Sequence, residues 1–177
     1  MEVPRKRGII REGLAGELSF IGGEMSVGEE SVVPVLRALK ESIPSEGFSI
    51  LDAPPGTACP AVEVMRGVDR VILVTEPTPF GLHDLKLAVE AVKILNIPMG
   101  LVINRANMGD DRVQDYAAQE NIPILMEIPY DRKIAESYSR GELFALCMPE
   151  WQGRFRDMYD QIASRAASPA GKWESAR

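Results

Sequence analysis

An aspartate and a nearby glycine follow a short apolar segment and have the chemistry of a metal and phosphate site. Asp52 closes the segment 48–52, and Gly56 stands in the loop after it. A carboxylate in this position can hold Mg2+, directly or through water. A glycine lets a backbone amide come close to a phosphate because it has no side chain. The alternative interpretation is that Asp52 caps a turn and that the two prolines after it only end a strand.

Two further residues at the ends of apolar segments could contact a ligand. The side-chain amide of Asn104 can read the edge of a base, and Pro129 can present flanking backbone groups. The alternative for Asn104 is an Asx turn leading towards Gly109, and the alternative for Pro129 is a simple strand-to-helix turn.

Apolar segments that resemble strands alternate with amphipathic segments that resemble helices. The predicted strands are 48–52, 71–75, 100–104 and 124–128, and the predicted helices are 32–42, 82–95, 110–120, 131–138 and 150–167. Such alternation predicts an α/β fold, a parallel sheet with helices on both faces. The strand 71–75 is almost continuously apolar, which is typical of burial on both faces. Ligands of these sheets bind outside the carboxyl ends of the strands, so we expect the polar residues after all four strands along one edge.

The N-terminal region has a different pattern. Two short segments with glycine-rich turns, 8–13 and 17–23, predict a β-hairpin. We expect a single domain over 1–167, made of a hairpin region 1–30, an α/β core 31–148 and a C-terminal helix 149–167. The small, polar segment 168–177 is expected to be a flexible tail.

Composition excludes several classes of protein. The 177 residues include 20 Lys and Arg and 26 Asp and Glu, giving a net charge of −6. This balance argues against general nucleic-acid binding, which needs clustered basic side chains. Two cysteines and one histidine cannot build a cysteine-rich cluster or a two-histidine metal site within one chain. No apolar run is long enough to span a membrane, so we expect a cytoplasmic protein.

Four short motifs carry a resemblance to a known family. They are Leu51-Asp52-Ala53-Pro54-Pro55-Gly56-Thr57, Val74-Thr75-Glu76-Pro77-Thr78-Pro79-Phe80-Gly81-Leu82-His83-Asp84-Leu85-Lys86, Val102-Ile103-Asn104-Arg105 and Ile128-Pro129-Tyr130-Asp131. The segment 50–143 resembles the C-terminal half of a MinD/ParA/Mrp-type P-loop ATPase. It is most similar to the branch with an inserted ferredoxin-like iron–sulfur domain, and 8–35 resembles the hairpin and helix after that insert.

The resemblance implies a role for each motif. Asp52 would be the Walker B-type aspartate that holds Mg2+ through water, and Gly56 would be the switch glycine that senses the γ-phosphate. Asn104 would recognise adenine with Arg105 beside it, and Pro129 and its neighbours would line the adenine pocket. Members of the family dimerise across the nucleotide and use ATP to drive partner binding or iron–sulfur cluster handling.

One departure from the family is large. The phosphate loop ending in Gly-Lys-Thr or Gly-Lys-Ser does not occur in the sequence, and the only Gly-Lys pair, Gly171-Lys172, has no hydroxyl after it. That loop supplies the amides and the lysine that bind the phosphates. We therefore expect weak or partner-dependent binding of ATP or ADP with Mg2+, and no efficient hydrolysis by the chain alone. The missing strand would leave apolar sheet edges, which predicts a homo-oligomer or a partner chain that supplies the phosphate loop.

Other interpretations remain open. The chain could be a catalytically inactive binding or adaptor module of the same fold. A phospho-acceptor receiver domain would need an acidic pair and a late lysine, and Arg11-Glu12 and Pro129-Tyr130 stand in their places. Phe80 could belong to a partner surface or to the core. Cys59 could hold a bridging cluster between two subunits, or it could be a free thiol.

Overall fold

The computed structural model describes residues 6–166. These residues group into two compact units, which meet in the chain between Gly67 and Val68. The single domain expected from the sequence stays a prediction, and the predicted tail 168–177 lies outside the described residues. Within residues 6–166, no helix is both long and apolar enough to cross a bilayer.

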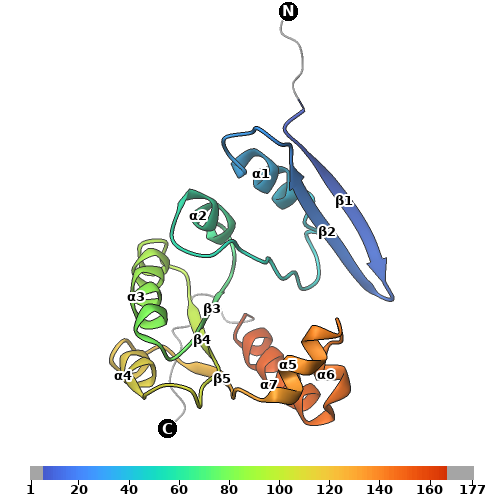
Figure 1. Ribbon diagram of the computed structural model, residues 1–177. Coiled ribbons are helices and arrows are strands. Elements are labelled where there is room, and N and C mark those ends of the chain that lie inside the picture. The colour runs from blue at the N-terminus through green and yellow to red at the C-terminus, as the bar shows by residue number, and fades with distance from the viewer. Residues whose placement is uncertain (1–5, 167–177) are drawn as a thin grey trace, which may run out of the picture. The chain divides into compact units, whose positions relative to one another are not determined.

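The first unit contains a β-hairpin and two helices (Figure 1). Strands β1 (Gly8–Ala15) and β2 (Leu18–Met25) pair antiparallel, which confirms the predicted hairpin. Helix α1 (Val33–Glu41) confirms the predicted helix 32–42, and α2 (Cys59–Met65) was not predicted.

Helix α1 lies unusually close to the hairpin. A Cβ atom added to either Gly8 or Gly23 would lie 2.7 Å from a methyl carbon of Val35. Because real Cβ atoms do not approach carbon so closely, only glycine fits at these two strand positions. On its other side, α1 is joined to α2 by an ion pair between Arg37 Nε and Glu63 Oε1 at 2.8 Å.

The predicted strand 48–52 is wrong. No residue of this segment is in a strand, and Ile50 is 85% exposed. A strand exists through its hydrogen-bonded neighbour, and no described strand pairs with this segment. Its apolar composition is therefore not enough to make it a strand.

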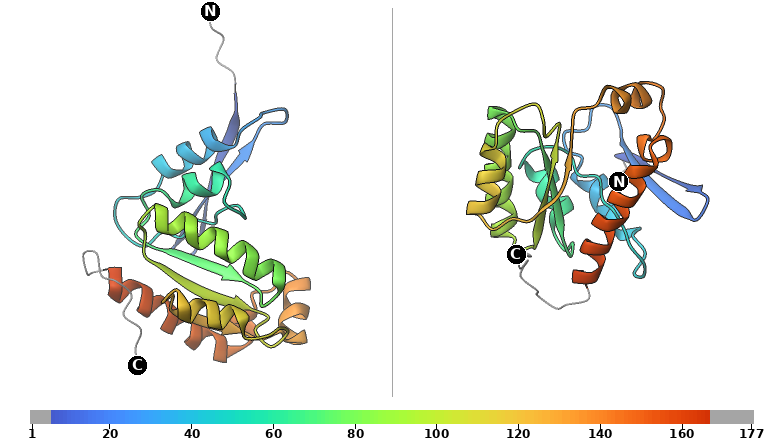
Figure 2. Two further views of the ribbon diagram at one scale, coloured as in Figure 1. Left: turned by 90° about the vertical axis from the view of Figure 1, so that its left-hand side faces the viewer. Right: turned by 90° about the horizontal axis from the view of Figure 1, so that it is seen from below.

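The second unit is a three-stranded parallel sheet covered by helices. The strands are β3 (Val71–Thr75), β4 (Met99–Asn104) and β5 (Ile124–Ile128), in the order β3-β4-β5. Figure 2 shows α3 (Pro79–Ile94) and α4 (Arg112–Gln119) on one face of the sheet and α7 (Pro149–Ala166) on the other. Helices α5 (Arg132–Ser139) and α6 (Phe144–Cys147) connect β5 to α7. This arrangement confirms the α/β class and three of the four predicted parallel strands.

The core of this unit lies on both faces of the central strand. Leu101 and Ile103 of β4 are fully buried on one face. Val102 points to the opposite face, where it packs in a cluster with Trp151 and Ile162 of α7. Alternate side chains of a strand point to opposite faces, so β4 is apolar throughout.

The prediction that the strand 71–75 is buried on both faces is wrong. Ile72 is 39% exposed and Val74 is 67% exposed. The apolar cluster beneath α7 includes residues of β4 and β5 but none of β3. One face of β3 is therefore left without a cover.

Candidate functional site

Three loops gather at one edge of the sheet in the second unit. They are 76–78 after β3, 105–111 after β4 and 129–131 after β5, and we call them the strand-end loops. They lie together because the carboxyl ends of parallel strands share one edge. Asn104, the half-buried last residue of β4, is paired in register with Ile128, the residue before Pro129.

The side chain of Asn107 holds two of these loops together. Its Oδ1 accepts a hydrogen bond from the backbone N–H of Tyr130 at 2.6 Å, and its Nδ2 donates to the backbone carbonyl of Tyr130 at 3.3 Å. The backbone N–H of Ala106 also donates to the carbonyl of Ile128 at 2.9 Å. These bonds extend the β4–β5 pairing beyond the strands and fix the loop that contains Pro129. The sequence gives only a general signal for Asn107, namely that asparagine is common in loops.

Arg105 connects the loops after β3 and β4. Its Nε lies 3.5 Å from Oε1 of Glu76, and both side chains are substantially exposed. An exposed ion pair contributes at most about 1 kcal/mol, so it orients the two loops more than it stabilises them. The backbone of Arg105 has a φ of 53°, a left-handed conformation that is uncommon for a residue with a side chain. Such conformations concentrate at functional sites.

The loop after β4 also touches the loop after β3 at Gly109. A Cβ atom at this position would lie 1.8 Å from the carbonyl oxygen of Pro77, whose side chain is buried. The two backbones can approach this closely only because residue 109 is glycine.

Helix α3 begins directly at this edge. Thr78 caps the helix, because its Oγ1 accepts a hydrogen bond from the backbone N–H of Gly81 at 3.0 Å. The hydroxyl of Thr75 donates to the carbonyl of Gly81 at 2.9 Å and ties the end of β3 to the first turn of the helix. A Cβ atom on Gly81 would lie 2.2 Å from the carbonyl oxygen of Glu76, so this turn also depends on glycine.

An acidic residue of the loop after β4 is fixed in its charged form. The guanidinium of Arg112 donates to both carboxylate oxygens of Asp110, at 2.9 and 2.8 Å. These hydrogen bonds, together with one from the backbone N–H of Arg112, lower the pKa of Asp110 below its usual value. The pair brings one negative and one positive charge to the loop and adds no net charge.

The other two predicted site residues belong to the first unit. Asp52 is exposed, and Gly56 has a φ of 86°, which favours glycine at this position. Their roles toward Mg2+ and the γ-phosphate stay predictions. Cys59, three residues further on, is an exposed free thiol. Among residues 6–166, no three His, Cys, Asp or Glu side chains gather closely enough to hold a metal ion.

Phe80 does not contribute to the core. Its side chain is 84% exposed, whereas Leu85 of the same helix is 3% exposed. Of the two alternatives for Phe80, core packing is therefore wrong, whereas Leu85 packs in the core.

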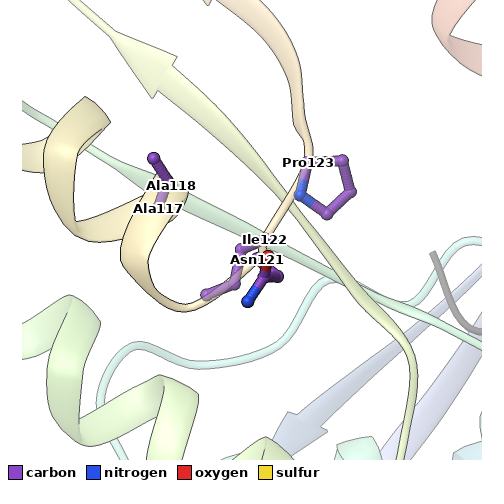
Figure 3. A pocket seen from close by; sticks show the side chains of 5 residues that line it. All are labelled: Ala117, Ala118, Asn121, Ile122 and Pro123. Atoms are coloured by element: carbon purple, nitrogen blue, oxygen red, sulfur yellow. The ribbon is translucent and has the colours of Figure 1, made fainter. Parts of the chain in front are cut away.

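A small hollow of about 220 Å³ lies at the opposite edge of the sheet, between the end of α4 and the start of β5 (Figure 3). Ala117, Ala118, Asn121, Ile122 and Pro123 line it. It contains no acid, base or nucleophile, so it offers no chemistry to a substrate.

Comparisons with known proteins place the chain among relatives. No protein-family model matches it. It is 35% identical over 127 residues to the uncharacterized protein MJ0579 of Methanocaldococcus jannaschii, a match that covers 71% of this chain and 44% of that protein. Proteins named iron–sulfur cluster carrier protein match more distantly: the Aquifex aeolicus protein is 29% identical over 118 residues, covering 58% of this chain and 32% of that protein. The M. jannaschii carrier is 26% identical over 134 residues, covering 67% of this chain and 46% of that protein.

The chain is a distant homologue of iron–sulfur cluster carrier proteins. It spans less than half the length of each of these three relatives. The similarity agrees with the family resemblance that the motifs carry, in which iron–sulfur handling is one of the expected activities.

Proposed function

We propose that this chain is the nucleotide-binding C-terminal half of a MinD/ParA/Mrp-type ATPase and that it serves iron–sulfur cluster or partner-protein handling. The observation that supports the proposal best is the way the strand-end loops are tied to one another around Asn104, Arg105 and Pro129. The relatives named iron–sulfur cluster carrier protein support the second part of the proposal.

The described residues fit the base of an adenine nucleotide better than its phosphates. Asn104 is half-buried at the end of β4 and offers both a donor and an acceptor to a base edge. Asn107 holds the backbone N–H and C=O groups of Tyr130 in place on the neighbouring loop. No lysine follows a glycine-rich loop in the sequence, so the phosphates lack their usual cationic partner. Nucleotide binding by the chain alone should therefore be weak, and hydrolysis inefficient.

We propose separately, from the family resemblance alone, that Asp52 and Gly56 of the first unit serve Mg2+ and the γ-phosphate. The exposed carboxylate of Asp52 would hold Mg2+ through water, and the backbone N–H of Gly56 would donate to the γ-phosphate. When bound, Mg2+ would supply charge neutralisation for the phosphates. A change of Asp52 to Ala should remove the Mg2+ dependence of nucleotide binding and leave the fold intact, because the side chain is exposed.

A second candidate is a catalytically inactive adaptor of the same fold that acts through protein contacts. The observation that favours it is Phe80, an aromatic side chain that is 84% exposed beside the strand-end loops. Exposed aromatic residues are enriched in protein interfaces.

Thermal unfolding with and without millimolar Mg-ATP separates the two candidates. A nucleotide present at about 100 times its dissociation constant stabilises the folded state by about 2.7 kcal/mol. We expect a shift with ATP, a smaller shift with GTP, and a loss of this preference in Asn104→Ala. Equal shifts with ATP and GTP would remove the adenine-reading role of Asn104. The absence of any shift in a folded protein would favour the adaptor.

A further inference from the structure

Helix α3 carries a line of exposed apolar side chains along its outer surface. Phe80 is 84% exposed and Ile94 is 85% exposed, and Leu87, midway between them, is 43% exposed. Successive members of this line are seven residues apart, which is almost two full turns of a helix, so their side chains lie on one face. We call this line the α3 stripe. In the left-hand view of Figure 2, α3 lies on the outside of the sheet, toward the viewer.

The α3 stripe lies opposite the face that the helix packs against the sheet. The buried residues of α3 are Leu85, Val89 and Val92, which are turned from the stripe by about half a turn. A helix that covers a sheet is normally polar on its outer face. Single exposed apolar side chains need no explanation, whereas a continuous group of them typically marks an interaction site.

The residues between the three apolar ones continue the same line. Asp84 lies between Phe80 and Leu87, and Ala91 lies between Leu87 and Ile94, so the steps along the stripe are four, three, four and three residues. This spacing is that of a helix seam that packs against a second helix. The stripe therefore fits a helical partner.

The charge along the stripe is negative. Asp84 lies within it and Glu90 lies beside it, and both are exposed. The two lysines of the helix are directed toward α4: Lys86 lies over the ring of a tyrosine of that helix, and Lys93 forms an ion pair with Glu120 at its C-terminal end. The two carboxylates therefore set the charge that a partner on the stripe would meet.

This charge argues against a second copy of the chain as the partner. If two copies packed antiparallel about Leu87, Asp84 of each copy would lie opposite Glu90 of the other, because both are three residues from Leu87. A parallel pair would place Asp84 opposite Asp84. Both arrangements bring like charges together, which opposes association, whereas lysine or arginine at these places would form ion pairs.

We propose that the α3 stripe binds an amphipathic helix of a partner protein. Its apolar side chains cover Phe80, Leu87 and Ile94, and its lysine or arginine side chains lie beside Asp84 and Glu90. The apolar contacts supply most of the affinity. The charged contacts select the partner and fix the register of the two helices, as a polar residue within a helix seam does.

The position of the stripe gives the proposed handling of a partner protein a location, and this step alone rests on the proposed function. Phe80 lies in the first turn of α3, two residues after Thr78 in the loop that follows β3. A partner helix that covers Phe80 would therefore reach the strand-end loops. The docking itself needs no nucleotide.

The test uses two synthetic helical peptides and the full chain without nucleotide. Both peptides have leucine at the seam positions of each heptad, and they differ only in the flanking residues, which are arginine in the basic peptide and glutamate in the acidic one. Fluorescence anisotropy of the labelled peptide measures binding, and we expect the basic peptide to bind at least about tenfold more tightly. A scrambled basic peptide should bind about tenfold more weakly than the ordered one, which separates helix docking from general attraction to a chain with a net charge of −6.

Substitutions in the chain assign the binding to the stripe. Phe80→Ala combined with Leu87→Ala should weaken binding of the basic peptide by about tenfold or more and leave the fold intact, because both side chains are exposed and alanine favours a helix. Tyr138→Ala is the matched control: this side chain is 83% exposed on α5 of the same unit, and the variant should bind like the unchanged chain. Asp84→Lys combined with Glu90→Lys should reverse the preference in favour of the acidic peptide. If circular dichroism shows that this variant is unfolded, Asp84→Asn with Glu90→Gln replaces it and should abolish the preference.

Three outcomes would overturn the proposal. The first is equal binding of the basic peptide and either the acidic or the scrambled one. The second is unchanged binding after the two alanine substitutions, which would mean that the peptide binds elsewhere. The third is self-association of the chain that the alanine substitutions abolish, which would identify a second copy as the occupant. A thermal shift with Mg-ATP in a chain that shows any of these outcomes would refute the docking proposal and leave nucleotide binding standing.

Discussion

Replacing Asn107 with alanine should loosen the loop that carries Pro129. The change removes two hydrogen bonds to the backbone of Tyr130, one of 2.6 Å and one of 3.3 Å. A hydrogen bond contributes about 0.5–1.5 kcal/mol net to stability. Asn107 is exposed and the second bond is long, so we expect a loss of about 1–2 kcal/mol in the free energy of unfolding.

The assay is urea unfolding monitored by circular dichroism. The dependence of the unfolding free energy on urea concentration is compared between variants. Met108→Ala is the matched control, because the Met108 side chain lies on the same loop, is 61% exposed and has no hydrogen bond to lose. We expect Met108→Ala to change stability by no more than about 0.5 kcal/mol. The backbone amide hydrogen of Tyr130 should also exchange faster with solvent in Asn107→Ala, and its exchange rate should be unchanged in the control.

The reasoning would be refuted if Asn107→Ala and Met108→Ala had the same stability within error. It would also be refuted if Asn107→Ala were destabilised while exchange at Tyr130 stayed the same. In that case the loss would come from somewhere other than the connection between the two loops. Nucleotide binding, where present, should weaken along with the protection of Tyr130.

Two further predictions concern close approach and charge. Gly109→Ala should destabilise the second unit by more than about 1 kcal/mol, because its Cβ would lie 1.8 Å from the carbonyl oxygen of Pro77. Gly153→Ala is the contrasting variant: a Cβ there meets nothing within 4 Å in helix α7, so the change should stabilise the unit by about 0.5–1 kcal/mol. Urea unfolding measures both changes. The hydrogen bond from Arg37 lowers the pKa of Glu63 below its usual value of 4.5, so the contribution of this pair is present above that pH and is lost as the pH falls through the lowered value. Arg37→Ala should therefore show a weaker dependence of stability on pH below about 4.5 than the unchanged chain, and identical acid titrations of the two would contradict this assignment.

The elements that could be predicted are those whose residue pattern directly reflects their surroundings in the fold. Strand β4 lies between two strands and beneath helices on both faces, and its sequence is accordingly almost continuously apolar. The hairpin was predictable because short strands and a glycine-rich turn are local features. The loop at Asp131 was predictable as a helix start, since Asp131 caps α5 by accepting a hydrogen bond from the N–H of Lys133 at 2.8 Å.

The sequence-based predictions are wrong where a neighbouring element determines whether a segment forms a strand or is buried. The segment 48–52 and strand β3 have similar apolar compositions, yet only β3 has a partner strand. Composition also could not show that one face of β3 would be uncovered. Periodicity cannot report whether a neighbouring element is present.

The candidate site shows the same division. The position of Asn104 and Pro129 at one edge of the sheet could be predicted, because the carboxyl ends of parallel strands share an edge, whereas their roles toward a ligand stay predictions. Asn107 and the contact of Gly109 with Pro77 depend on which loops meet in space, and neither produces a periodic signal. They became visible only as distances between residues of different loops.

The order of strands in the second unit has a consequence for how the protein is made. Strands β3, β4 and β5 are neighbours in the sheet in the same order as in the chain, and α3 and α4 lie between them. Each strand can therefore pair with the one synthesised just before it, and little loop-closure entropy is lost at each step. The cover of the opposite face comes later, because Trp151 and Ile162 belong to α7, which follows all three strands. During synthesis, Val102 and Met126 stay exposed until α7 emerges, so this is the interval in which a nascent chain most needs protection from aggregation.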